Sequence, residues 1–292
     1  MSTVTLAIRT LNAGPWLADL IPRLAEQRRK PEEFLVVDSG SIDGTVERLL
    51  SAGDAITAAA SPGATAGRAR LVTIDGREFT HARSTNLAFR EARGDLVAMI
   101  SQDALPGDGE WLARLVAPLE AGDGASVAAT FGRHRARPGA FALERWQIEA
   151  DYPAAPPAGV LFSNVNSAAR RSAWQDEPFD ESLLIAEDRV WAARQVARGR
   201  RIAYVPEAVV LHSHEYTIGQ AAERCRAESR ARREAEGHTE DASLLFKAWP
   251  RQAGRDLARL AREGNALAWP RAAVYRLAQF YGMWRGGRVP RG

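Results

Sequence analysis

The hydrophobic and polar positions of the chain follow two different periods over its first hundred residues. Apolar residues alternate or run together over 4–9, 33–37 and 96–100, which predicts strands. Over 15–27 and 84–93 they recur at helical spacing, and Gly94 directly ends the second of these stretches. Strands that alternate with helices predict a mostly parallel α/β sheet flanked by helices.

The same two periods continue along the rest of the chain. We expect further strands at 71–74, 126–131, 162–169 and 201–205, and further helices at 46–50, 109–119, 138–150 and 188–198. Residues 51–70 are rich in Ala, Gly and Ser, which predicts a loop with at most a weak strand. Beyond residue 217 the pattern is helical, with breaks near Pro250 and Pro270. We therefore expect an α/β domain over 1–217 and a helical extension over 218–292.

Polar residues follow three of the expected strands at the point where each strand ends. These are Thr10 and Asn12, Asp38 and Ser39, and Gln102 and Asp103. Ligands of open α/β sheets bind at the carboxyl ends of the strands. The three clusters therefore predict a single ligand site assembled from three separate loops.

Two carboxylates in these clusters suit the recognition of a nucleotide. Asp38 ends a strand and could accept a hydrogen bond from a nucleobase or a ribose hydroxyl. Asp103 could hold Mg²⁺ or Mn²⁺, with substrate phosphates as further ligands, and the metal would then offset charge on a departing diphosphate. Either residue could instead be a simple turn or strand-end aspartate. The chain lacks the glycine patterns of dinucleotide-binding and P-loop sites.

Two later segments carry further candidate chemistry. Glu187 and Asp188 open a helix, where they could cap its N-terminus, or one of them could act as a general base toward an acceptor hydroxyl. His212 and His214 lie two positions apart in an extended segment, so both side chains point to one side and could bind a metal. The spacing lacks the additional ligands of a structural zinc site.

The residues at the start of the helix near 84 suit an anion. Arg83 could take a phosphate through two parallel hydrogen bonds, and a helix N-terminus favours negative charge. His81 and Asn86 lie beside it in the sequence. The alternative for all three is capping at the protein surface.

Composition and charge narrow the class of protein. Hydrophobic residues make up 46% and charged residues 26% of the chain, which is typical of a globular protein. The single cysteine, Cys225, rules out an internal disulfide, and we find no signal segment or apolar run of membrane-spanning length. We therefore expect a cytoplasmic protein. Residues 219–292 hold fifteen Lys and Arg against eight Asp and Glu. This basic end suits an anionic partner, or is simply an Arg-rich helical surface.

Several of these segments, in this order, resemble glycosyltransferase family 2 proteins with a GT-A fold, and among them the bacterial rhamnosyltransferase-like members. The resemblance covers roughly residues 3–217. The matching segments are Ile8-Arg-Thr-Leu-Asn12, Val36-Val-Asp-Ser-Gly-Ser-Ile-Asp-Gly-Thr45, Phe79-Thr-His-Ala-Arg-Ser-Thr-Asn86, Ser101-Gln-Asp-Ala-Leu-Pro106, Phe162-Ser-Asn-Val-Asn-Ser167, Glu187-Asp188 and Val210-Leu-His-Ser-His214.

The resemblance implies a role for each candidate residue. The expected donor-binding residues are Thr10, Asn12, Asp38, Ser39, His81, Arg83, Asn86, Gln102 and Asp103. The residues expected on the acceptor side or in support are Asn164, Asn166 and Glu187. Asp188 would be the base of an inverting displacement, and Asp103, His212 and His214 would hold the divalent metal. Only one aspartate of the family's Asp-x-Asp motif is present, and the Gln-x-x-Arg-Trp motif of processive members is absent.

We therefore expect an inverting, non-processive glycosyltransferase that uses a nucleotide-diphosphate sugar. The resemblance favours rhamnose from a thymidine-diphosphate donor, and a glycan or lipid-linked acceptor in cell-surface polysaccharide synthesis. Two alternatives remain: a non-catalytic module that binds nucleotide sugars, and a sugar nucleotidyltransferase. The latter class usually opens with a glycine-rich basic loop, whereas 9–15 holds one glycine.

The aromatic, leucine-rich and basic composition of the C-terminal helices suits a membrane surface on the cytoplasmic side. It equally suits packing on the first domain or a homo-oligomer interface. The apolar residues concerned are Trp249, Leu257, Leu260, Trp269, Tyr275, Leu277, Phe280, Tyr281 and Trp284. We expect no nucleic acid among the partners.

Overall fold

The computed structural model describes residues 2–57, 69–121, 126–155, 162–183, 186–214 and 216–288. Contacts divide the chain into two compact units, one of residues 1–138 and 148–213, the other of residues 139–147 and 214–292. The expected division ran at 217/218, so the segment 139–147 joins the helical unit instead of the α/β unit. The roles we expected for the two regions stay predictions.

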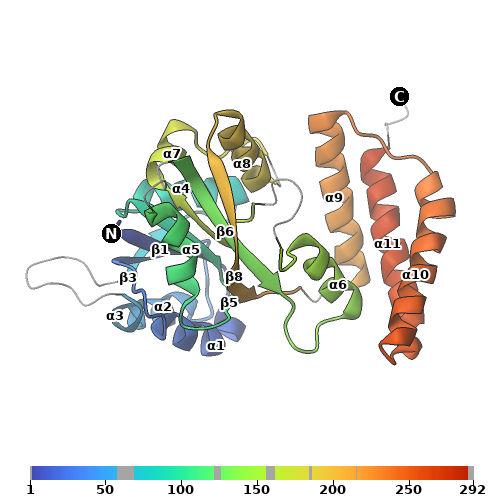
Figure 1. Cartoon of the computed structure of the whole chain (residues 1–292), viewed down its shortest axis with the longest axis horizontal. Coiled ribbons are helices and arrows are strands. Elements are labelled where there is room, and N and C mark those ends of the chain that lie inside the picture. The colour runs from blue at the N-terminus through green and yellow to red at the C-terminus, as the bar shows by residue number, and fades with distance from the viewer. Residues whose placement is uncertain are drawn as a thin grey trace, which may run out of the picture. The chain divides into compact units, whose positions relative to one another are not determined.

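The first unit contains one mixed sheet and the helices that cover it (Figure 1). Its strands are β1 Val4–Thr10, β2 Glu33–Asp38, β3 Ala69–Thr73, β4 Leu96–Ser101, β5 Leu105–Pro106, β6 Val127–Arg135, β7 Asn166–Arg170 and β8 Arg201–Leu211. Its helices are α1 Gly14–Ala25, α2 Thr45–Ser51, α3 Gly53–Ile56, α4 His81–Glu91, α5 Trp111–Glu120, α7 Arg171–Asp176 and α8 Glu187–Ala197. The helix α6 Ala142–Asp151 begins in the second unit and ends in the first.

The strand order is β3-β2-β1-β4-β7-β6-β8-β5. β3, β2, β1 and β4 are parallel neighbours, β7 is antiparallel to β4 and β6, and β8 is parallel to β6. The carboxyl ends of β1, β2, β4, β6 and β8 therefore meet at one edge, where β7 begins. The expected α/β class with a mixed, mostly parallel sheet is confirmed.

Alternate residues of the central strands build a hydrophobic core on each face of the sheet. On one face Leu6 and Ile8 pack with residues of α1, α2 and α5. On the other face Ala7 packs with residues of α4, α7 and α8. The period of two thus determines which side chains of β1 meet the second group of helices, and Arg9 belongs to that side.

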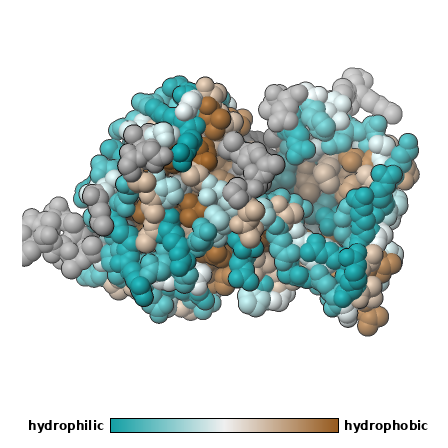
Figure 2. All heavy atoms as spheres, in the orientation of Figure 1, coloured by the Kyte–Doolittle hydropathy of each residue, from teal (hydrophilic) through white to brown (hydrophobic). Residues whose placement is uncertain are grey.

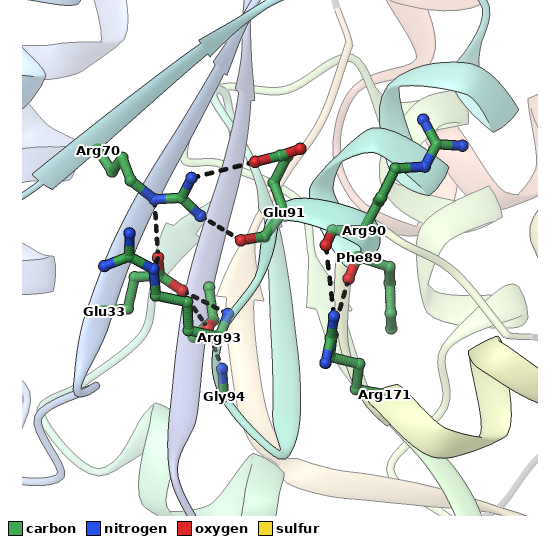
Figure 3. A network of polar contacts seen from close by, with 9 residues as sticks. Glu33, Arg70, Phe89, Arg90, Glu91, Arg93, Gly94 and Arg171 are labelled. Atoms are coloured by element: carbon green, nitrogen blue, oxygen red, sulfur yellow. Dashed lines mark hydrogen bonds and ion pairs between the residues drawn. The ribbon is translucent and has the colours of Figure 1, made fainter.

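A polar network ties the far end of α4 to the sheet (Figure 3). Arg70 of β3 donates to the Glu33 carboxylate at 3.0 Å and to the Glu91 carboxylate at 3.1 Å. Glu33 also accepts from the Arg93 backbone N–H at 2.9 Å, and Arg171 donates to the Phe89 carbonyl at 3.2 Å. Because α4 is held at this end, its N-terminus is directed to the edge of the sheet where the candidate site residues lie.

Several elements differ from the sequence-based expectation: β7 begins at Asn166 instead of 162, α6 at Ala142 instead of 138, and residues 53–56 of the expected loop form α3. The expected strand 201–205 and the segment 208–211 form one long strand, β8, whose pairing with β6 shifts register between Gly132 and Arg133. α4 begins at His81 instead of 84, because the Thr80 side chain caps it by accepting from the Arg83 backbone N–H. Of the expected loop over 51–70, residues 58–68 lie outside the described residues.

The second unit is helical. It contains α9 Ile218–Glu236, the π-helix η2 Leu244–Ala248, α10 Trp249–Arg262, the 3-10 helix η3 Ala266–Ala268, α11 Trp269–Gly287 and the first turns of α6. Pro250 and Pro270 lie in the first turns of α10 and α11, as is usual for proline at a helix start. Within the described ranges we find no helix long and apolar enough to cross a membrane.

α11 packs closely on α9 through glycine. A side chain at Gly282 would meet the Ala222 carbonyl oxygen at 2.1 Å, and one at Gly286 would meet that of Arg226 at the same distance. Leu143 and Trp146 of α6 share a buried cluster with Leu260 and Tyr275. The core of this unit therefore depends on α6 as well as on the C-terminal helices.

Candidate active site

The three polar loops predicted at the strand ends are joined by hydrogen bonds. The Gln102 side-chain amide bonds both backbone groups of Leu11, at 2.7 and 3.1 Å. The Ser41 hydroxyl accepts from the Asn12 backbone N–H at 2.9 Å, and the Asn12 amide oxygen accepts from Ile42 at 3.0 Å. Asn12 has a positive φ of 50°, which asparagine tolerates well. The loops after β1, β2 and β4 therefore form one connected rim.

Asp38 is the centre of this rim and is 3% exposed. Its carboxylate accepts from the Thr10 and Ser41 hydroxyls at 2.9 and 2.5 Å and from the backbone N–H groups of Gly40 and Ser41 at 2.8 Å. Burial alone would raise the pKa of Asp38, but these hydrogen bonds outweigh it and hold the pKa below its ordinary value. Four bonds use the acceptor positions of a carboxylate. Asp38 thus shapes the loop in which Ser39 lies, and its contact with a nucleobase stays a prediction.

The acid pair Glu187 and Asp188 opens α8. The preceding residue, Ala186, has the left-handed φ of 62°, a conformation that costs a non-glycine residue about 1–2 kcal/mol. Asp188 accepts from the Asn164 backbone N–H at 3.2 Å and from the Arg189 backbone N–H at 2.8 Å. Strain of this kind is concentrated at functional sites. The backbone therefore fixes where the two carboxyl groups lie.

Both carboxyl groups of the pair hold protons more tightly than usual. Burial is the main cause that raises the pKa of Glu187 to about 7, and the neighbouring Asp188 adds to it. Burial also raises the pKa of Asp188, against hydrogen bonds from Asn164 and Arg189. The positive charge of Arg9 opposes both shifts. A carboxyl whose pKa is raised accepts a proton more readily during a reaction, which suits a general base.

Arg9 is a cation that acts on several acidic groups of this region. Its guanidinium donates to the Thr85 hydroxyl at 3.0 Å and to the His81 carbonyl at 3.3 Å. Burial lowers the pKa of Arg9, while attraction to Glu187, Asp188 and Asp103 counteracts that effect. The side chain is thus anchored on the first turn of α4 and acts on all three acidic groups.

Asp103, His212 and His214 lie together after β4 and β8. One potential ligand atom of each lies within 4.8 Å of those of the other two, and His212 Nε2 is 3.4 Å from Asp103 Oδ2. Two cis ligands at about 2.1 Å from a metal are about 3 Å apart, so the spacing of Asp103 and His212 fits a shared divalent ion. The carboxylate and the two imidazoles are a donor set that a divalent transition metal accepts.

Several predicted site residues are engaged in contacts with protein groups. Asn86 donates to the Phe179 carbonyl and the Glu181 carboxylate at 2.9 Å, and accepts from Trp174 at 2.8 Å. Arg83 pairs with Glu181 at 3.5 Å. This anchors the 174–181 segment on α4, and the expected donor contacts of both residues stay predictions.

The two predicted asparagines near β7, Asn164 and Asn166, lie in different surroundings. Asn166 is fully buried, accepts from the Trp111 indole at 2.8 Å and donates to the Ala208 carbonyl at 2.9 Å. It fills the space beside Gly132, where a Cβ would meet Asn166 at 2.3 Å. Asn164 lies next to Asp188 instead, and its buried side-chain nitrogen has no hydrogen-bond partner among the described residues. Of the two, only Asn164 contacts Asp188, and its expected role on the acceptor side stays a prediction.

Sequence reasoning missed two arginines. Arg9 lies inside a matching segment, and its position among apolar alternations of β1 was the available signal. Arg137 lies just before Pro138, in a segment with no recognisable motif. It nevertheless contacts the backbone of both Asp103 and Ser213.

Known proteins are similar to this chain in sequence and in fold. Residues 5–173 match the family Glycosyl transferase family 2. The O-antigen chain rhamnosyltransferase RfbN of Salmonella typhimurium is 31% identical over 232 residues, which cover 73% of this chain and 67% of RfbN. WbaN of Salmonella anatum, also an O-antigen chain rhamnosyltransferase, is 29% identical over 240 residues, covering 77% and 70%.

Among solved structures, the mannosyltransferase PcManGT of Pyrobaculum calidifontis, in complex with GDP-Man and Mn²⁺, superimposes with a TM-score of 0.65. The sequences are 20% identical, and the match covers 98% of this chain and 87% of PcManGT. This similarity supports the GT-A fold. Because residues 5–173, more than half of the chain, match the family model, the chain belongs to glycosyl transferase family 2.

Proposed function

We propose that the protein transfers a sugar from a nucleotide-diphosphate donor to an acceptor hydroxyl with inversion, and that Asp188 is the base. The observation that carries this proposal is the acid pair at the start of α8, in which Glu187 is buried and Asp188 partly buried. Asp188 lies beside Asn164 and Arg9, and burial raises its pKa toward the range in which a carboxylate accepts a proton. A single displacement with one base inverts the configuration at the anomeric carbon.

Asp103, His212 and His214 are the residues that would hold a divalent metal. Such a metal would offset negative charge on the departing nucleoside diphosphate. Mg²⁺ takes oxygen ligands, whereas imidazole nitrogen suits transition metals. The donor set therefore favours Mn²⁺ over Mg²⁺, and the PcManGT structure contains Mn²⁺.

Rhamnose from a thymidine-diphosphate donor is the substrate we propose, for use in the synthesis of a cell-surface polysaccharide. Support comes from the two curated relatives, which are both O-antigen chain rhamnosyltransferases. We further propose a glycan or lipid-linked acceptor and the addition of one sugar per encounter. The rim of loops around Asp38 would receive the nucleotide, because it lies at the carboxyl ends of the parallel strands.

The test is a transfer assay with purified protein, thymidine-diphosphate rhamnose, Mn²⁺ and a panel of diphospholipid-linked mono- and disaccharides. We expect release of nucleoside diphosphate and a product whose new linkage has the anomeric configuration opposite to that of the donor, measured by mass spectrometry and NMR. Release of pyrophosphate would instead identify a sugar nucleotidyltransferase. Donor binding without turnover on any acceptor would identify a non-catalytic module.

We also propose that α10 lies on the surface of an anionic membrane and brings the enzyme to lipid-linked acceptors. Phe246 before α10 and Leu267 after it are 78% and 97% exposed, and Leu257 is exposed between them. In Figure 2 hydrophobic spheres interrupt the mainly hydrophilic surface of this unit. Arg251, Arg255 and Arg262 are exposed on the same helix and would supply positive charge that faces lipid phosphates.

Sedimentation with lipid vesicles tests this membrane contact. We expect the protein to bind vesicles that contain anionic lipid and to remain free with purely zwitterionic vesicles. Replacing Phe246 and Leu267 by Ser should weaken binding several-fold without changing thermal stability, since both side chains are exposed. Equal binding of wild type and variant would count against α10 as the contact.

A further inference from the structure

The loop after β4 and the segment after β8 are joined by one side chain. Arg137 Nη1 donates to the Ser213 carbonyl at 3.1 Å, and Nη2 donates to the Asp103 carbonyl. The Arg137 backbone N–H also approaches the Ser213 hydroxyl at 3.4 Å. Ser213 lies between the two histidines of the candidate metal site. One guanidinium therefore contacts the backbone of both segments that supply potential metal ligands.

The guanidinium is itself fixed in place. Its Cζ atom lies 4.0 Å from the centre of the Trp16 ring, so the cation stacks on an aromatic face. Pro138 follows directly and restricts the backbone of Arg137 to extended conformations. A planar guanidinium with several fixed donors can hold two carbonyl groups at a set separation, which the ammonium of lysine cannot do.

Aromatic rings limit the orientation of His212. The His134 ring meets His212 nearly edge-on, with centroids 5.4 Å apart at 79°, and stacks on Tyr152 at 3.8 Å. The His212 backbone N–H donates to the Arg135 carbonyl at 2.8 Å. These contacts restrict the orientation of the His212 ring, and Arg137 donates to the backbone of Asp103 beside it.

We propose that Arg137 is a positioning residue that sets the separation of Asp103 from the His212–His214 segment and so gives this site its affinity for a divalent metal. The inference rests on the metal role that we propose for these residues in sugar transfer. Arg137 is a cation near the site, so by charge alone its removal would strengthen metal binding. If Arg137 positions the metal ligands, its removal should instead weaken metal binding.

The experiment is a titration of the full chain with Mn²⁺ alone, without donor, followed by the electron paramagnetic resonance of free Mn²⁺. For Arg137→Met we expect affinity to fall about 10–100-fold, the usual cost of losing a residue that orients metal ligands. Arg137→Lys keeps the charge but loses the fork, and should also bind more weakly. Arg135→Met is the matched control, since it removes an exposed arginine side chain at the end of β6, two residues before Arg137. It keeps the backbone carbonyl that accepts from His212 and should bind as wild type.

The possible outcomes distinguish a failure of the positioning role from a failure of the metal role. Arg137→Met that binds Mn²⁺ as tightly as wild type, or more tightly, overturns the positioning role and leaves the proposed transferase intact. Wild type that binds no Mn²⁺ overturns the metal role together with the positioning role. Thermal unfolding of the metal-free proteins identifies a variant that has lost its fold, in which case Arg137→Lys decides the question.

Discussion

Asp38 is a buried and Asp188 a partly buried aspartate at the same edge of the sheet, yet their surroundings are opposite. Asp38 accepts four hydrogen bonds from its own loop and from Thr10, and its pKa lies below the ordinary value although burial would raise it. Asp188 accepts two backbone hydrogen bonds and lies beside the like charge of Glu187. Burial therefore prevails and raises the pKa of Asp188.

The difference separates a carboxylate that holds its own loop together from the one that we propose as the base. A carboxylate saturated with donors stabilises the fold in its charged form and has little tendency to take up a proton. A buried carboxylate with few donors destabilises the fold when charged, and this is the state in which a base must act. Stability is commonly lost at such positions in exchange for activity.

The largest effect should come from Asp188→Asn. We expect kcat to fall about 10²–10⁴-fold, because the change removes the proton acceptor and keeps the side-chain shape. The dissociation constant of the donor, measured by calorimetry, should change little. The matched control is Glu187→Gln, which alters the neighbouring carboxyl and should lower kcat far less. Equal losses in both variants would show that the pair acts as a unit and would remove the distinction between its members.

The second effect concerns stability and should have opposite signs at the two aspartates. Asp38→Ala leaves several donors without an acceptor, and we expect a loss of about 2–3 kcal/mol in the free energy of unfolding. Asp188→Asn removes a partly buried charge whose pKa is raised by burial, and should raise stability at pH 8. Chemical denaturation of both variants against wild type measures the two signs. Destabilisation by both would mean that Asp188 is as structural as Asp38.

The third effect is a shift in pH dependence through Arg9. The base must be ionised, so activity should fall as pH drops through the pKa values of the acid pair, of which that of Glu187 is about 7. Arg9 lowers both pKa values, so Arg9→Gln should move the acid limb of kcat/KM upward by about 0.5–1 pH unit. The control is Arg83→Gln. Arg83 is half exposed and lies in the first turn of α4, the turn that Arg9 contacts, and its replacement should leave the acid limb in place.

The smallest effect is the pH dependence of stability itself. The folded pKa of Glu187 is above its ordinary value of 4.5, so the folded state holds its proton longer than the unfolded state does. The contribution of Glu187 to the free energy of unfolding is therefore fully present below pH 4.5 and is lost as the pH rises to about 7. Glu187→Gln should flatten this part of the curve in urea unfolding at a series of pH values. If stability depends on pH in the variant as it does in wild type, a group other than Glu187 titrates in this range.

The sequence predicted the part of the site that depends on strand order. Thr10, Asp38 and Gln102 end neighbouring parallel strands, so their proximity follows from the alternation of strands and helices. It could not show that Asn86 and Asn166 are occupied by Trp174 and Trp111, because those partners lie 88 and 55 residues away in the chain.

Arg137 could not be found from the sequence for a similar reason. Its role depends on β6, β8 and the loop after β4 meeting at one place, which no local pattern encodes. The continuous β8 was also missed, because Pro206 interrupts a run of residues that otherwise favours a strand. Long-range contacts and irregular pairing were thus beyond local periodicity.

The division of α6 between the two units has a consequence for any shortened version of this enzyme. Leu143 and Trp146 are buried with Leu260 and Tyr275, and Trp146 donates to Glu263 at 3.0 Å. A truncation after residue 217 would leave these α6 side chains uncovered in the middle of the remaining chain. The C-terminal helices are therefore no removable appendage, and a minimal soluble version needs α6 redesigned before the helices are deleted.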